Sequence, residues 1–139
     1  MTKAEYEKIA NTSMSNEEFL ILLILLPVFA IAHADGEYDE LEKNAMHELI
    51  GGLVSEVYSE LDKKSIETMI TAYEQDFNFI FRNQYLEKEL LQELRRETQM
   101  IDGLANQVNS FMNEIASASK GISDLEQNKI DEVNDLLNT

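Results

Sequence analysis

The chain has 139 residues and a mass of 15.9 kDa, which predicts one domain over residues 1–139, and its 44% hydrophobic residues are enough for a core. Cysteine is absent, which excludes disulfides, thiolate zinc sites and thiol catalysis. The 11 basic and 27 acidic residues give a net charge of −16, which argues against nucleic-acid binding. This acidity favours a well-solvated surface, or attraction for cations and basic partners.

The first expected elements are a short helix over residues 4–10 and a long apolar helix that follows Ser15, the start of an S-x-x-E capping box. The run from Phe19 to Ala32 has 14 residues, whereas a bilayer span needs roughly 20. We therefore expect a buried central helix, kinked near Pro27 and ending at about residue 34, and no transmembrane segment. No signal-peptide pattern opens the chain, so we expect a cytoplasmic protein.

Helical periodicity continues through the rest of the chain and predicts an all-α, compact bundle of about seven to eight helices. Gly51-Gly52 predicts the end of a helix that begins near Asp39, so that a separate segment covers residues 54–61. Later helices are expected over residues 65–82, from about 86 until the pattern weakens near 102, over 104–115, and over about 123–137.

Residues 31–44 repeat weakly at residues 115–128. With an offset of 84 residues and no gap, the two segments share Ile, two Ala, Leu, Glu and Asn. The repeat predicts that the bundle is built from two related helix-turn-helix units that face one another across a shared core. Two copies are too few for a solenoid, so a closed bundle is expected.

The turn after the central helix, residues 35–42, carries five acids and is called the acidic turn below. Asp39 and Glu42 have the D-x-x-E spacing of a helix cap, and Ser123 and Glu126 keep the equivalent spacing in the second copy. Capping therefore suffices to explain Asp39 and Glu42. Asp35 differs, because its counterpart in the second copy is a serine.

A metal site is the alternative hypothesis for the acidic turn. Ile31 and His33 would fall on positions one and three of an EF-hand loop, and isoleucine cannot bind calcium, so the turn is not an EF-hand. Three carboxylates, those of Asp35, Asp39 and Glu42, are spaced to converge around one turn. With water and backbone carbonyls they would form a weak site for a divalent cation such as Ca²⁺ or Mg²⁺.

Other catalytic and metal motifs are missing from the sequence. His33 and His47 do not form a zinc motif; we expect a helix-terminal structural role for His33 and a surface position for His47. No nucleophile elbow or glycine-rich phosphate loop occurs, so no catalytic or cofactor-binding residues are predicted. Carboxylate-based acid/base catalysis stays the least favoured interpretation.

The segment Ala-His-Ala-Asp-Gly-Glu-Tyr-Asp-Glu-Leu-Glu, residues 32–42, resembles the signature of TerB-like domains, named for the bacterial tellurite-resistance protein. The weaker copy around residues 116–126 is similar to that family's internal symmetry. The resemblance implies a compact all-helical bacterial domain with a role in tellurite or general stress response. It also implies metal-ion sensing or binding through Asp35, Asp39 and Glu42, and an association with co-chaperone J domains. Ser119-Lys120 departs from the pattern, so a symmetric pair of metal sites is not expected.

Two functional interpretations remain. The first is a non-enzymatic stress-response module that binds a divalent cation weakly at the acidic turn and engages other proteins. The second is a purely structural or protein-interaction domain, for example one associated with a co-chaperone, in which the acids only cap helices. The spacing of Phe77, Phe79 and Phe81 places them in the core or in a subunit contact, and a homodimer stays open.

Overall fold

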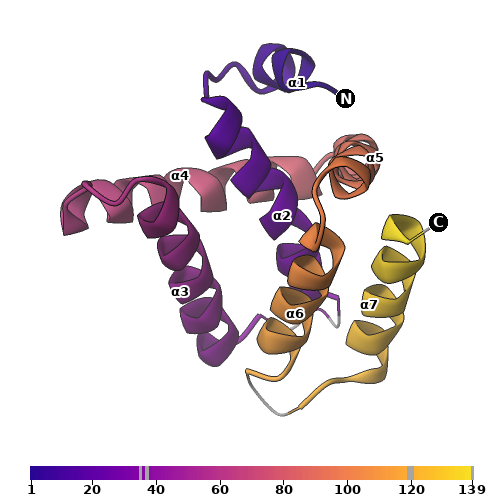
Figure 1. Cartoon of the computed structure of the whole chain (residues 1–139). Helices are drawn as coiled ribbons and strands as arrows, with labels where there is room; N and C mark the ends of the chain where they lie inside the picture. The colour runs from indigo at the N-terminus through magenta and orange to yellow at the C-terminus, as the bar shows by residue number, and fades with distance from the viewer. Residues whose placement is uncertain (35, 37, 119–120, 139) are drawn as a thin grey trace.

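The computed structural model describes residues 1–34, 36, 38–118 and 121–138, which form helices and no strand. The helices are α1 (Lys3–Ala10), α2 (Asn16–Ala32), α3 (Glu40–Val57), α4 (Lys63–Phe81), α5 (Gln84–Met100), α6 (Leu104–Ala116) and α7 (Asp124–Leu137). They pack into one compact bundle (Figure 1). The predicted all-α fold is confirmed.

Helix α2 lies at the centre of this bundle. It is apolar on every side, and Phe19 together with all residues from 21 to 32 is buried, as expected for a helix that neighbours surround. Helices α3 to α7 all contact it. The helix continues through Pro27 and ends at Ala32, two residues earlier than expected. Within the described part of the chain, no helix is long and apolar enough to cross a membrane.

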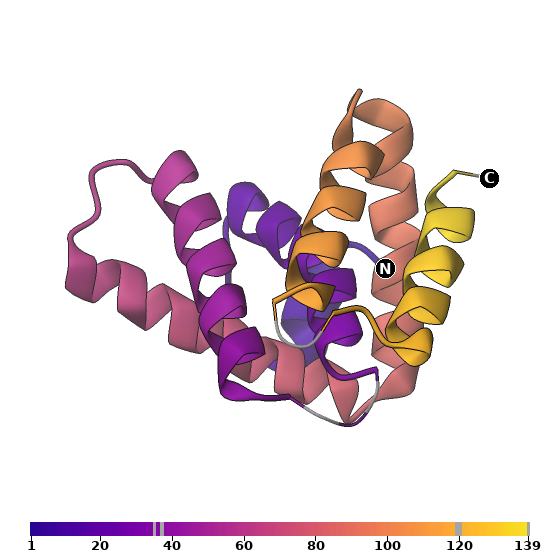
Figure 2. The same ribbon diagram turned by 90° about the horizontal axis from the view of Figure 1, so that it is seen from below.

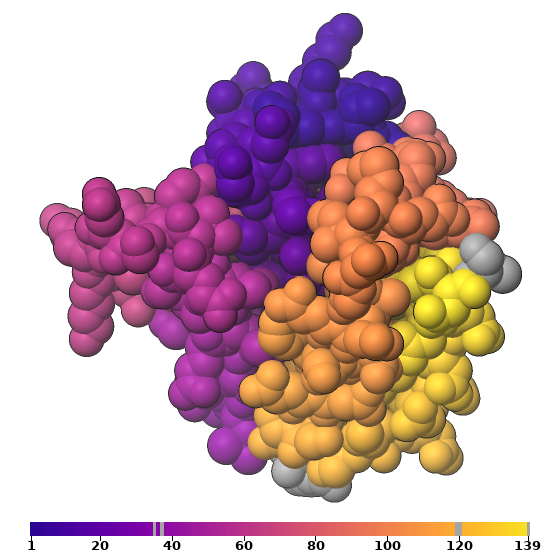
Figure 3. All heavy atoms as spheres, in the orientation of Figure 1, coloured from indigo at the N-terminus to yellow at the C-terminus, as the bar shows by residue number. Residues whose placement is uncertain are grey.

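The hairpins α2–α3 and α6–α7 pack as equivalent units. Their first helices, α2 and α6, contact each other, and the second helix of each hairpin contacts the first helix of the other. Figure 1 shows α3 and α7 on opposite sides of the α2–α6 pair. In the space-filling view, the surfaces of α3 and α6 meet (Figure 3), and both helices contact α2. This reciprocal packing is the arrangement that the internal repeat predicts.

The expected end of α3 at Gly51-Gly52 is wrong, because the helix runs on to Val57. Neither glycine has the positive φ that ends a helix in a left-handed cap. A glycine inside a helix costs about 1 kcal/mol relative to alanine, whereas burying an aliphatic side chain contributes about 1.5–3 kcal/mol. Leu53 and Val54 continue the buried face beyond the glycines, so packing outweighs propensity and no separate helix covers 54–61.

Helices α4 and α5 connect the two hairpins, and α4 lies against α3 and α5. Phe77 of α4 is fully buried, while Phe79 and Phe81 are half-buried and packed against the core. The aromatic cluster is therefore part of the core. Helix α1 packs at the end of the molecule near the start of α2 (Figure 1), where Tyr6 is fully buried.

Candidate functional site

The described part of the acidic turn is a helix cap. The Glu42 amide donates a hydrogen bond of 2.9 Å to Asp39 Oδ1, and the Asp39 amide lies 3.4 Å from Glu42 Oε1. These reciprocal bonds form a capping box at the start of α3, which satisfies amides that have no partner inside the helix. Asp35, the third predicted ligand, lies outside the described residues.

The second hairpin repeats this cap at the start of α7. The Glu126 amide donates to Ser123 Oγ at 3.2 Å, and the Ser123 amide donates to Glu126 Oε1 at 2.9 Å. The two glutamates are also buried alike, since Glu42 is 4% exposed and Glu126 is 3% exposed. The capping interpretation of both turns is confirmed.

The capping bonds limit which carboxylate oxygens of the acidic turn are left to bind a metal. Asp39 and Glu42 each use a carboxylate oxygen in the capping box, so a cation there would share ligands that the helix start already employs. Among the described residues, no group of three or more histidine, aspartate and glutamate side chains is arranged to hold a metal ion. The predicted set includes Asp35, which lies outside the described residues.

His33 closes the C-terminal end of α2, as predicted. Its Nδ1 lies 3.0 Å from the carbonyl oxygen of Phe29, so Nδ1 carries the proton that is donated to this oxygen. The ring centroid lies 4.3 Å from that of Phe29 and 4.2 Å from that of Tyr38. Burial, and then the charges of Glu74 and Glu42, raise the pKa of Tyr38. The packed rings of Phe29, His33 and Tyr38 join the acidic turn to the core.

A groove with a cavity volume of about 450 Å³ opens beside the ring of His33. It lies over the C-terminal end of α2, between α7 and the α4–α5 corner, and these segments gather at the end of the molecule seen in Figure 2. Small or aromatic side chains line it together with ionisable and amide groups. The lining residues are Ala30, His33, Ala34, Phe81, Gln84, Glu87, Leu125, Asn128, Lys129 and Glu132.

Charged side chains in the groove are already paired. The Lys129 ammonium lies 3.4 Å from a Glu87 carboxylate oxygen and 3.9 Å from one of Glu132. The Glu87 side chain is 15% exposed and that of Lys129 is 25% exposed, so this pair lies in the wall of the groove rather than on its rim. Leu125 is 56% exposed at the same place, which leaves an apolar side chain beside the charges.

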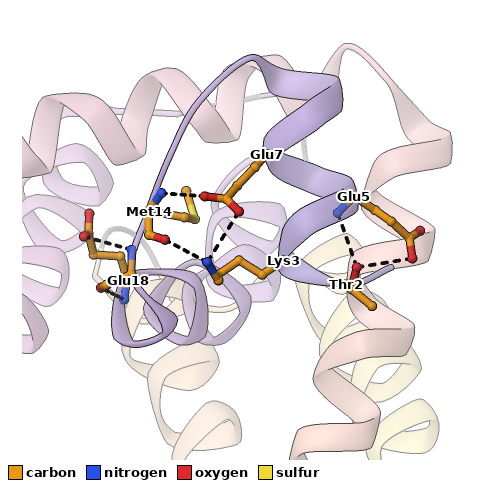
Figure 4. Close-up of polar contacts among 7 residues, drawn as sticks. Thr2, Lys3, Glu5, Glu7, Met14 and Glu18 are labelled. Carbon is orange, nitrogen blue, oxygen red and sulfur yellow. Dashed lines mark hydrogen bonds and ion pairs between the residues drawn. The ribbon is translucent and has the colours of Figure 1, made fainter.

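The contacts at the start of the chain hold α1 against the segment that precedes α2 (Figure 4). Lys3 Nζ donates to the carbonyl oxygen of Met14 at 3.0 Å and lies 3.4 Å from Glu7 Oε1. The Met14 amide in turn donates to Glu7 Oε2 at 2.9 Å, and this bond is the main reason that the pKa of Glu7 is lowered. Together these contacts fasten α1 to the segment that leads into α2.

Two further pairs of ionisable side chains involve α4. His47 is half-exposed, as predicted, and its Nε2 lies 3.1 Å from Glu67 Oε1 of α4. Behind α1, the Tyr6 hydroxyl donates to Asp76 Oδ1 at 3.1 Å. Burial raises the pKa of Asp76, and the bond from Tyr6 lowers it by a smaller amount. The first pair joins the consecutive helices α3 and α4, and the second joins α1 to α4.

No protein-family model matches the chain, and no curated protein or solved structure is significantly similar to it. The resemblance to TerB-like domains therefore stays a prediction from the motif at residues 32–42.

The groove was not foreseen from the sequence. Its residues come from α2 and the two residues after it, and from α4, α5 and α7, and no spacing in the chain connects them. The only local signal is the i,i+3 pair of Lys129 and Glu132 on α7, which many solvent-exposed helices also carry.

Proposed function

We propose that the chain is a non-enzymatic, TerB-like stress-response module of the bacterial cytoplasm that acts by binding other proteins. The observation that carries this proposal is the groove between α7 and the α4–α5 corner. Pockets with an apolar floor and a few convergent polar groups are typical of binding sites. The reciprocal packing of the two hairpins agrees with the all-helical, internally symmetric domain that the resemblance implies.

The groove fits an extended or helical segment better than a small substrate. It lies open along α7, and its rim includes the exposed side chain of Leu125, which would lose apolar surface to a partner. Catalysis at this place would need an ionisable group with a strongly shifted pKa in contact with the reactant. The carboxylates of Glu87 and Glu132 are instead engaged with Lys129.

Photo-crosslinking in cells tests this function. A benzophenone amino acid placed at Leu125 should crosslink a discrete partner protein. Leu41 is the matched control, because it is the second residue of α3 as Leu125 is of α7, and each is 56% exposed. Crosslinks from neither position, or equal crosslinks from both, would contradict a docking role for the groove.

A weak divalent-cation site at the acidic turn is the second candidate function. It is supported by the five acids within residues 35–42, by the buried carboxylate of Glu42, and by the motif that resembles TerB-like domains. Asp35 is the decisive residue, because the second turn keeps the cap but has serine at the equivalent position. Since Asp39 and Glu42 already serve the cap, we expect millimolar rather than micromolar affinity.

Calorimetric titration with Ca²⁺, Mg²⁺, Mn²⁺ and Zn²⁺ tests the cation site. Wild type should bind at least one of them, and Asp35→Asn should abolish this binding. Asp124→Asn removes the same charge beside the second cap and should leave the titration unchanged. The site is disproved if wild type gives no heat of binding, or if both variants lose it equally.

A further inference from the structure

We propose that the groove over the C-terminal end of α2 binds a basic amphipathic segment of a partner protein. The inference rests on the proposed function, because it names the class of partner for the same groove. It is carried by the pairing of Lys129 with Glu87 in the wall of the groove and with Glu132, whose side chain is 73% exposed, at its edge, and by the apolar side chains next to these charges.

The groove already accommodates an ammonium group. Lys129 Nζ lies between two carboxylates, at 3.4 Å from Glu87 and 3.9 Å from Glu132. A lysine or arginine of a partner would find the same acceptors, and with Lys129 moved aside it would meet two negative charges. The half-buried position of Glu87 strengthens this attraction, because water screens it less than at an exposed site.

Apolar and aromatic surface next to the carboxylates suits an amphipathic segment. Ala30 and Ala34 are small, so a side chain can approach the end of α2 closely. The rings of His33 and Phe81, whose centroids are 5.7 Å apart, add aromatic surface to the wall of the groove, against which an aliphatic chain can pack. Leu125 adds an exposed apolar contact beside them. A segment with alternating apolar and basic side chains matches both parts of the groove.

The charge of the whole molecule selects among partners. At a net charge of −16, a second copy of the chain or an acidic surface is repelled, whereas a basic segment is attracted over a longer range. An anionic ligand would have only Lys129 as a cationic partner among the lining residues, against Glu87 and Glu132. The groove therefore favours a positively charged occupant.

Fluorescence anisotropy with three synthetic peptides tests this inference at physiological ionic strength. The peptides share one leucine spacing and carry lysine, glutamine or glutamate at the polar positions. The lysine peptide should bind wild type most tightly. Glu87→Gln combined with Glu132→Gln should weaken it about tenfold, which corresponds to about 1.4 kcal/mol. The control, Glu48→Gln with Glu56→Gln, removes the same charge from α3 and should change the affinity less than about twofold.

Two further variants make the test independent of a general attraction to an acidic protein. Lys129→Gln should tighten binding of the lysine peptide, because it frees Glu87 and Glu132; an anion site would show the opposite sign. Leu125→Ser should weaken binding, while Leu41→Ser, equally exposed, should not. Equal effects of the groove and control variants, or weaker binding by Lys129→Gln, would overturn the proposal.

The outcomes also separate this inference from the proposed function. If the glutamine or glutamate peptide binds most tightly and depends on Leu125, the groove is a docking site but its partner is not basic. If the lysine peptide binds without dependence on Leu125 while crosslinking from Leu125 fails in cells, the attraction is general and the docking function fails with it.

Discussion

Glu42 and Glu126 show how one residue serves both local structure and packing. Each accepts a hydrogen bond from the amide of the capping residue and is almost completely buried. A buried carboxylate is costly unless hydrogen bonds satisfy it, and the capping box supplies such a bond in both hairpins. The capping box therefore gives this glutamate the same structural role at the start of α3 and of α7.

Asp76 is the residue for which burial predicts a pH effect on stability. Burial raises its folded-state pKa, so its contribution to stability is present below the ordinary aspartate pKa and is lost as pH rises through the raised value. Asp76→Asn keeps an acceptor for the Tyr6 hydroxyl but cannot ionise. The variant should therefore gain stability relative to wild type as pH rises from about 4 towards neutrality. Urea unfolding at several pH values measures this difference.

Asp62 provides a control of opposite sign for that experiment. The Ser65 amide donates to Asp62 Oδ1 at 2.7 Å, and this backbone hydrogen bond lowers the pKa of the Asp62 carboxyl. Its contribution is present above the ordinary aspartate pKa and is lost as pH falls through the lowered value. Asp62→Asn should therefore lose stability relative to wild type as pH rises. Parallel pH profiles for wild type and Asp76→Asn would contradict the assignment to Asp76.

At the scale of elements, the glycines of α3 separate helix propensity from turn geometry. Gly52 is exposed, lies inside the helix, and has space for a Cβ, with no atom within 4 Å. Gly52→Ala should therefore raise the free energy of unfolding by about 0.5–1 kcal/mol. Thermal or urea unfolding measures this change.

Gly121 is the matched control, because it has equal space but a φ of +90°. The left-handed region costs a residue with a side chain about 1–2 kcal/mol, so Gly121→Ala should destabilise the protein although nothing clashes. Stabilisation by both substitutions, or by neither, would show that backbone conformation does not decide the difference.

The sequence predicts those features of the fold that depend on interactions between residues close together in the chain. The caps at Ser15, Asp39 and Ser123 follow from side chains three residues apart, and the apolar run of α2 follows from its composition. The end of α3 could not be predicted locally, because Gly51-Gly52 favours a stop that burial of Leu53 and Val54 overrides. The groove could not be predicted either, since its walls meet only after α4 and α5 place α7 beside α2.

On the scale of the whole molecule, the two hairpins share a plan but differ in what surrounds them. Each places its second helix against the first helix of the other, and α4 and α5 break the symmetry. The α4–α5 corner lies beside α7 at the groove, whereas α3 packs against α4. Lys129 faces Glu87 there, and its counterpart in the first hairpin, by the offset of the repeat, is Ala45. The two hairpins therefore differ at this position, and the charged pair of the groove lies beside α7.

The net charge of −16 predicts that salt stabilises this fold. Repulsion among carboxylates opposes compaction, and about 0.1 M salt reduces the range of such interactions to roughly 10 Å. The melting temperature should rise between low and moderate NaCl concentration, as differential scanning calorimetry can measure. Lysine at exposed Glu56 and Glu60 changes the net charge from −16 to −12, two units per substitution. This variant should have a higher melting temperature at low salt, and its melting temperature should rise less with NaCl. If the rise equals that of wild type, the repulsion comes from particular pairs of carboxylates and not from the net charge.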